Sequence, residues 1–260
     1  MDLGLAGKTA LVSAASRGLG RACALSLARE GVDVTIVARR PGPLEETAGD
    51  IRAETGVRVT AVAADITDAE GRAKALAACP EPDILVTNTG GPPHVSDFRR
   101  LGRDDWIALF DAYLVAPISL IQATVDGMIE RRFGRIVNIT SIVVKMPGGS
   151  LELSAGPRAG FTGFVAGLAR QVVRHNVTIN NLLPGSLDTD RVRENMEVRA
   201  RQAGCTIDEM YTRRAAEAPA GRIADPQEFG DTCAFLSGVQ AGYITGQNLL
   251  LDGGRFPGTF

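Results

Sequence analysis

Short apolar runs alternate with longer segments of helical periodicity along nearly the whole chain. Near-continuous stretches of Val, Ile and Leu are typical of strands that are buried on both faces of a sheet. The segments between them are long enough to form crossover helices. The pattern therefore predicts an α/β fold, a doubly wound parallel sheet of seven strands with helices on both faces. The predicted strands are residues 9–13, 32–38, 57–64, 83–87, 134–140, 177–183 and 247–252.

One helix in the second half of the chain has a clear apolar stripe. Apolar side chains recur from Phe161 to Val172 at the spacing of a single helix face. Ser154 is a residue type that caps helix N-termini, and Pro157 would then fall in the first turn, where its missing N–H matters little. This interpretation predicts a helix that begins at Ser154.

Residues 186–220 have the weakest pattern in the chain and are polar and rich in arginine. We expect this stretch to be a flexible flap over the substrate, beside the carboxyl edge of the sheet. No repeat or low-complexity linker interrupts the remainder. The sequence thus predicts one domain over residues 1–260.

Composition excludes several classes of protein. With 28 basic and 30 acidic residues, the formal net charge is −2, which gives no sign of a nucleic-acid partner. We see no apolar run of membrane-spanning length, no signal-peptide pattern at the start, and no metal-ligand spacing among the four cysteines. We therefore expect a cytoplasmic protein that binds neither membrane nor metal.

A glycine-containing loop joins the first predicted strand to a helix. In ALVSAASRGLGRA, residues 10–22, Gly18 and Gly20 allow backbone N–H groups and a helix N-terminus to approach a pyrophosphate. The strand–loop–helix context favours a Rossmann-type dinucleotide site over an ordinary turn.

The second predicted strand is followed by arginines instead of a carboxylate. A carboxylate there would bind the ribose 2′-hydroxyl of NAD, whereas Arg39 and Arg40, with Arg17 from the first loop, favour the 2′-phosphate of NADP. The alternative is that Arg39 and Arg40 are solvated surface charges. We favour NADP (NADPH) because of their place in the nucleotide fold.

Over nearly its full length the chain resembles the short-chain dehydrogenase/reductase family. Within that family its sequence is most similar in character to the 3-oxoacyl-carrier-protein reductases. The resemblance implies cofactor-binding roles for residues of the glycine loop, the adenine-side acidic turn, the turn after strand four and the Pro-Gly and Thr of the nicotinamide side. These residues are Ser13, Ser16, Arg17, Gly18, Leu19, Gly20, Asp65, Ile66, Asn88, Gly90, Pro184, Gly185 and Thr189. It also implies that Ser141 is the catalytic serine of strand five.

Four positions depart from the family pattern. The first glycine of the loop is Ala14, so we expect a turn that tolerates a Cβ. The family's active-site asparagine falls on Tyr113. Its Tyr-x-x-x-Lys pair falls on Leu151 and Ala155. Because that tyrosine is the family's general acid and base, the usual proton transfer cannot be carried over to this chain.

A candidate replacement for the missing tyrosine and lysine lies about one helical turn further along the chain. Ser154 and Arg158 lie four residues apart, on one helix face. One hypothesis is that Ser141 and Ser154 bind the substrate oxygen, while Arg158 supplies positive charge to it or to the cofactor ribose. The other is that Ser154 only caps the helix and Arg158 lies at the surface or in an interface.

Four other side chains are candidate proton carriers, besides water. His94 follows strand four and has a suitable ordinary pKa, Tyr113 replaces the asparagine, Lys145 follows Ser141, and Tyr211 lies on the flap. For each of them, a structural role away from the chemistry is the alternative.

Three functions remain open at this stage. The first is an atypical NADP-dependent oxidoreductase that acts on a small-molecule carbonyl or alcohol. The second is a catalytically silent nucleotide-binding pseudoenzyme, and the third is a non-redox lyase or isomerase on the same fold. The resemblance also implies a homo-oligomer, a tetramer or dimer, formed through residues 103–130, residues 154–175 and the C-terminal segment.

Overall fold

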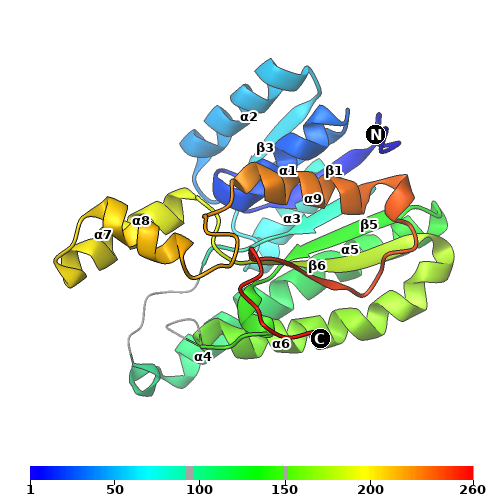
Figure 1. Ribbon diagram of the computed structural model, residues 1–260. Helices are drawn as coiled ribbons and strands as arrows, with labels where there is room; N and C mark the ends of the chain where they lie inside the picture. The colour runs from blue at the N-terminus through cyan, green and yellow to red at the C-terminus, as the bar shows by residue number, and fades with distance from the viewer. Residues whose placement is uncertain (92–96, 149–151, 260) are drawn as a thin grey trace.

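A computed structural model of the chain describes residues 1–91, 97–148 and 152–259. Seven parallel strands form one sheet in the order β3-β2-β1-β4-β5-β6-β7 (Figure 1), and the predicted fold class is confirmed. Every predicted strand is present, with ends that differ by at most two residues. The strands are β1 (Thr9–Ser13), β2 (Asp33–Ala38), β3 (Val59–Ala63), β4 (Ile84–Thr87), β5 (Gly134–Ile139), β6 (Val177–Pro184) and β7 (Asn248–Leu251).

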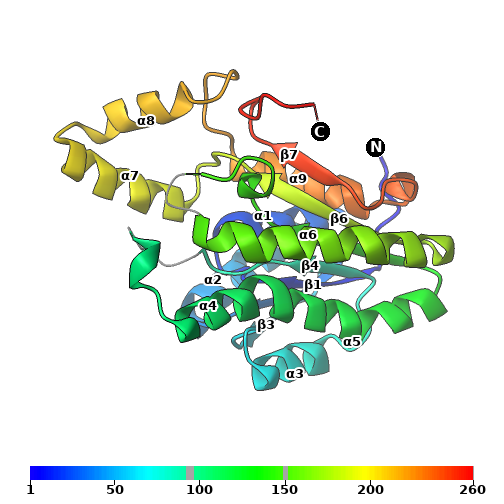
Figure 2. The same ribbon diagram turned by 90° about the horizontal axis from the view of Figure 1, so that it is seen from below.

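Helices cover both faces of the sheet (Figures 1 and 2). On one face lie α1 (Gly18–Arg29), α2 (Pro41–Thr55) and α9 (Pro226–Ser237), and on the other lie α3 (Ala69–Ala78), α5 (Ala116–Glu130) and α6 (Glu152–Val172). Each face has its own apolar core, because the strand side chains alternate between the two faces. Short 3₁₀ turns occupy Phe98–Arg100, Ile142–Val144, Val173–His175 and Val239–Ala241.

A row of hydrogen-bonded polar side chains crosses four neighbouring strands of the sheet. Thr87 of β4 donates to Asn138 of β5 (2.7 Å), and Asn138 donates to Asn181 of β6 (3.0 Å). Asn181 in turn donates to Asn248 of β7 (2.8 Å). These residues are also backbone partners in the sheet register. Since buried polar groups are stable only when hydrogen-bonded, the row specifies the register beneath the site.

The start of α6 differs from the prediction. The helix spans Glu152–Val172, so Ser154 lies inside it and is not its N-cap, and Pro157 is an interior residue. A proline there removes the N–H that would bond to the carbonyl of Leu153. Ser154 is fully buried and accepts a hydrogen bond from Arg158. The serine is therefore occupied by a side-chain contact within the helix.

Residues 186–220 contain two helices that the sequence analysis missed. Thr189 caps α7 (Asp190–Ala203), and Thr206 and Glu209 form a reciprocal capping box on α8 (Ile207–Ala215). The pair projects from one end of the sheet (Figures 1 and 2). Met196 and Ala200 are its buried apolar residues, too few to give a strong apolar stripe. The flexibility of this flap stays a prediction.

Contrary to the expectation from sequence, the run Arg103–Glu130 is long and apolar enough to span a membrane. It consists of α4 (Arg103–Phe110), a π-helical turn (Asp111–Val115) and α5. Core helices of soluble proteins also meet this criterion. Here Leu120, Ile121 and Met128 are fully buried against the sheet, which accounts for the apolar character of α5.

Candidate active site

A large cleft opens at the carboxyl ends of the strands. Chain order reverses between β1 and β4, and ligands of open α/β sheets bind outside such a switch point. The cleft has a volume of about 1140 Å³. Fifteen of the predicted site residues line it: Ser16, Arg17, Gly18, Leu19, Arg39, Arg40, Asp65, Ile66, Asn88, Gly90, Ser141, Arg158, Pro184, Gly185 and Thr189.

Ser13 and Gly20 lie behind the wall of the cleft and support it. The Ser13 hydroxyl donates to the carbonyl oxygen of Asn88 and accepts from the Asn88 N–H, both at 2.8 Å, which ties the ends of β1 and β4 together. A Cβ added at Gly20 would lie 2.4 Å from the carbonyl oxygen of Ala14. Glycine is thus required at position 20 for the close approach of α1 to the loop.

Ala14 does not change the turn in the way we expected. It adopts a left-handed backbone with φ of +49°, a conformation that costs a residue with a Cβ about 1–2 kcal/mol. The loop is therefore strained at Ala14, and the backbone of the following residues still reaches the cleft.

The arginines near the adenosine end have different partners. Arg39 lies 3.9 Å from the Asp65 carboxylate and is largely exposed, so its guanidinium is accessible to a ligand. Arg40 is exposed at the start of α2. Arg17 instead pairs with Glu194 of α7 at 2.9 Å. Arg39 and Arg40 are thus both exposed on the cleft wall, while Arg17 connects the glycine loop to the flap.

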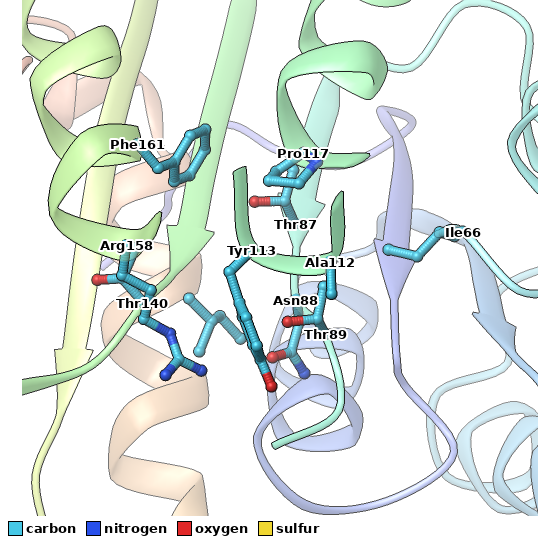
Figure 3. A pocket seen from close by; sticks show the side chains of 11 residues that line it. Ile66, Thr87, Asn88, Thr89, Ala112, Tyr113, Pro117, Thr140, Arg158 and Phe161 are labelled. Atoms are coloured by element: carbon cyan, nitrogen blue, oxygen red, sulfur yellow. The ribbon is translucent and has the colours of Figure 1, made fainter. Parts of the chain in front are cut away.

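At the inner end of the cleft, Arg158 and Tyr113 pack against each other (Figure 3). The Arg158 guanidinium lies 4.3 Å from the centre of the Tyr113 ring, and its Nη1 donates to Ser154 Oγ at 2.5 Å. The Tyr113 hydroxyl donates to the carbonyl oxygen of Gly90 at 2.7 Å. Ser141 also lines the cleft, and its hydroxyl accepts from the N–H of Val143 at 3.3 Å. Arg158 is therefore no surface residue, because its guanidinium faces the site.

Burial shifts the pKa values of the two packed side chains. Desolvation lowers the pKa of Arg158 to about 10, partly countered by Tyr113, and nearby Arg191 lowers it further. Desolvation raises the pKa of Tyr113, against smaller opposing effects of Arg158 and Arg191. Arg158 is thus charged and Tyr113 neutral at physiological pH, and the phenol proton is directed at a backbone carbonyl.

The other candidate proton carriers differ in position. Tyr211 donates to Asp188 at 3.0 Å, and the Lys145 ammonium lies 5.7 Å from the centre of the Phe256 ring. Neither is among the residues that line the cleft in the described part of the chain. His94 lies outside the described residues. Of the three candidates that the structure describes, Tyr113 alone lines the inner end of the cleft.

The sequence analysis missed Arg191. Its guanidinium lies so close to Gly91 that an added Cβ there would clash with it, and it lines the same cleft as Arg158. The sequence could have pointed to Arg191 through its position, two residues after Thr189, which the family resemblance places on the nicotinamide side.

The fold and the glycine-loop cleft define a nucleotide-binding α/β protein with a reaction site at the β1–β4 switch point. The family model for short chain dehydrogenase matches residues 8–200, and the chain belongs to that family.

Several relatives match over nearly the whole chain. The 3-oxoacyl-[acyl-carrier-protein] reductase of Vibrio cholerae is 33% identical over 98% of this chain and 99% of that protein. The NADPH-dependent reductase BacG of Bacillus subtilis is 31% identical over 95% and 97%. Among solved structures, L-sorbose reductase from Gluconobacter frateurii, complexed with NADPH and L-sorbose, has a TM-score of 0.93 at 28% identity and covers 99% of this chain and 100% of that chain.

Proposed function

We propose that this protein is an atypical NADP-dependent oxidoreductase that transfers hydride between nicotinamide and a small carbonyl or alcohol substrate. The observation that carries the proposal is one cleft whose wall holds most of the predicted cofactor-side residues together with Ser141 and the guanidinium of Arg158. The NADPH-dependent relatives and NADPH complexes among similar structures support the choice of cofactor.

The residues of the cleft fit NADP(H). The loop at Ser16–Leu19 and the N-terminus of α1 present backbone N–H groups to a pyrophosphate, because Gly20 lets the helix approach closely. Arg39 and Arg40 face a 2′-phosphate, and Asp65 and Ile66 lie at the adenine end. When bound, the nicotinamide supplies the hydride; positioning and charge stabilisation come from the chain.

We further propose that Ser154 and Arg158 stand where the family has its tyrosine and lysine. Arg158 lines the cleft and donates to the buried Ser154 across one helical turn. Neither Ser154 nor Ala155 lines the described cleft wall, and Leu151 lies outside the described residues. This assignment replaces the register that put the pair at Leu151 and Ala155, because Arg158 is a cation on the described cleft wall and Ala155 is not on that wall.

In this arrangement, the chain stabilises charge on the substrate oxygen without a phenolic acid. The hydroxyl of Ser141 binds the oxygen, Arg158 places a permanent positive charge beside it, and the buried Ser154 hydroxyl holds the Arg158 guanidinium in position. Arginine does not release its proton at neutral pH, so the proton comes from water or from another side chain. Exclusion of bulk water at the buried end strengthens each of these interactions.

The first test is calorimetric titration with NADPH and NADH. We expect NADPH to bind more tightly, since each charged hydrogen bond to the 2′-phosphate contributes about 1.5–3 kcal/mol. The double variant Arg39→Gln/Arg40→Gln should lose about 10- to 100-fold in NADPH affinity and leave NADH binding unchanged. Arg29→Gln, an exposed arginine paired with Glu54 outside the cleft, is the control. No binding of either dinucleotide would overturn the proposed function.

The pH profile of hydride transfer identifies the proton source. Carboxylates, guanidiniums and phenols ordinarily titrate outside the range from about pH 6 to pH 9. The described cleft wall has titratable groups of these types alone. We therefore expect a flat profile over this range. A rate that falls with a midpoint near neutral pH, and a profile that becomes flat in His94→Gln, would make His94 the proton carrier instead.

The pseudoenzyme and the lyase or isomerase predict different results in a panel of carbonyl compounds. An oxidoreductase consumes NADPH absorbance with at least one of them, and Ser141→Ala slows this by about 10²–10³-fold, as loss of an oxyanion donor does. Tight NADPH binding without consumption in any assay supports the pseudoenzyme. Turnover of substrate at constant NADPH supports the non-redox enzyme.

The predicted homo-oligomer also has support in exposed apolar side chains. Phe164 of α6, Val115 at the start of α5, and Tyr243 and Leu249 of the C-terminal segment are all more than a third exposed. They lie on the segments that the family resemblance assigns to assembly. Sedimentation of the purified chain decides between a monomer, a dimer and a tetramer.

A further inference from the structure

The cleft carries far more positive charge than the chain as a whole. Seven arginines and three aspartates line its described wall, although the formal net charge of the chain is −2. Low-dielectric walls concentrate the field of such charges and favour anionic ligands. The 2′-phosphate and pyrophosphate of NADP account for the arginines of the adenosine end.

Some arginines in and near the cleft outside that end are paired with carboxylates. Arg214 pairs with Glu217 at 2.6 Å, and Glu217 also pairs with Arg255 at 2.6 Å. On α7, Arg193 pairs with Asp188 at 2.7 Å and does not line the cleft.

Arg158 is different because it is buried without a carboxylate. Only 9% of the residue is exposed, and no described residue places a carboxylate oxygen within 4 Å of its guanidinium. Its described partners are a hydroxyl, Ser154, and an aromatic ring, Tyr113. A guanidinium has five N–H donors, and the bond to Ser154 uses one of them. The remaining donors suit a planar oxyanion.

A second guanidinium converges on the same place. Tyr113 packs on Arg158 and donates to Gly90, and the next residue, Gly91, lies directly against the guanidinium of Arg191. Arg158 and Arg191 line the same cleft and contact neighbouring parts of its wall, and the positive charge of Arg191 lowers the pKa of Arg158 in addition to the larger effect of desolvation. An anion between two like charges in a partly desolvated cleft converts that repulsion into attraction.

We propose that Arg158 and Arg191 together hold a carboxylate of the substrate, so that the enzyme acts on oxo acids or hydroxy acids rather than on neutral ketones or sugars. This proposal rests on the proposed function, because it assigns the substrate class of the same site. Ser141 lines the same cleft, so a carbonyl adjacent to the held carboxylate lies on the side of the site where hydride transfer is proposed.

The test uses the protein saturated with NADP, so that cofactor phosphates occupy their own sites and no turnover occurs. Pyruvate, acetoacetate and levulinate are titrated by calorimetry, each against its methyl ester, which keeps the carbonyl and removes the charge. We expect at least one acid to bind about 10- to 100-fold more tightly than its ester, the range for a charged hydrogen bond.

Arg191→Gln should abolish this preference, and Arg201→Gln should preserve it. Arg201 lies on the same helix, is exposed and does not line the described cleft wall, so both variants remove one charge from α7. Equal binding of acids and esters, no binding of any acid, or an unchanged preference in Arg191→Gln overturns the inference. If the protein binds no NADP, the proposed function fails, and the same titrations of the cofactor-free protein still decide the inference.

Discussion

Replacing Gly20 with alanine is expected to reduce NADPH affinity by about 10- to 100-fold and the free energy of unfolding by about 1–3 kcal/mol. The new Cβ would lie 2.4 Å from the Ala14 carbonyl oxygen and 2.9 Å from its carbon, both backbone atoms. Because Ala14 is already left-handed, the loop has little freedom to relax. Its displacement moves the N–H groups that face the pyrophosphate.

Calorimetry with NADPH and chemical denaturation measure the two effects. The matched control is Gly49→Ala on α2, where an added Cβ meets nothing within 4 Å. That variant should bind NADPH normally and gain about 0.5–1 kcal/mol in stability, since alanine is the better helix former. Wild-type NADPH affinity in Gly20→Ala would show that the loop does not hold the cofactor as proposed.

A triple variant, Tyr113→Asn with Ser154→Tyr and Arg158→Lys, is expected to reduce carbonyl compounds about 10²–10⁴-fold faster than the wild type, the usual contribution of a positioned general acid. Residue 154 is fully buried, so a phenol there needs the volume that the Tyr113 ring now fills beside Arg158. The lysine keeps a positive charge next to the phenol and lowers its pKa.

Single-turnover oxidation of NADPH across the carbonyl panel measures this gain. The Tyr113→Asn variant alone is the control, because it opens the same space without adding an acid. NADPH affinity near that of the wild type confirms that the triple variant is folded. A folded triple variant that is no faster than the control would contradict the assignment of positions 154 and 158.

The strands and the glycine loop were predictable from local sequence. Residues 9–13 form β1 with the predicted bounds, because a strand buried on both faces is a continuous apolar run whatever its neighbours. The glycine loop was equally visible, since the spacing of Gly18 and Gly20 reflects a local turn. Helices α7 and α8 were missed because they bury few side chains and therefore have weak apolar periodicity.

The arrangement of side chains at the inner end of the cleft could be seen only in the tertiary structure. A serine three residues before a proline has the same local signature whether it caps a helix or, like Ser154, lies buried inside one. Whether Arg158 faces solvent or a cleft depends on the π-helical turn that brings Tyr113 against it, from a segment more than forty residues away in the sequence. Arg191 reaches the same place from a third element. Local sequence therefore determined the sheet and the glycine loop, because both depend on short-range periodicity and turn geometry. The positive charge at the substrate end of the cleft depends instead on long-range packing, which brings Arg158, Tyr113 and Arg191 together.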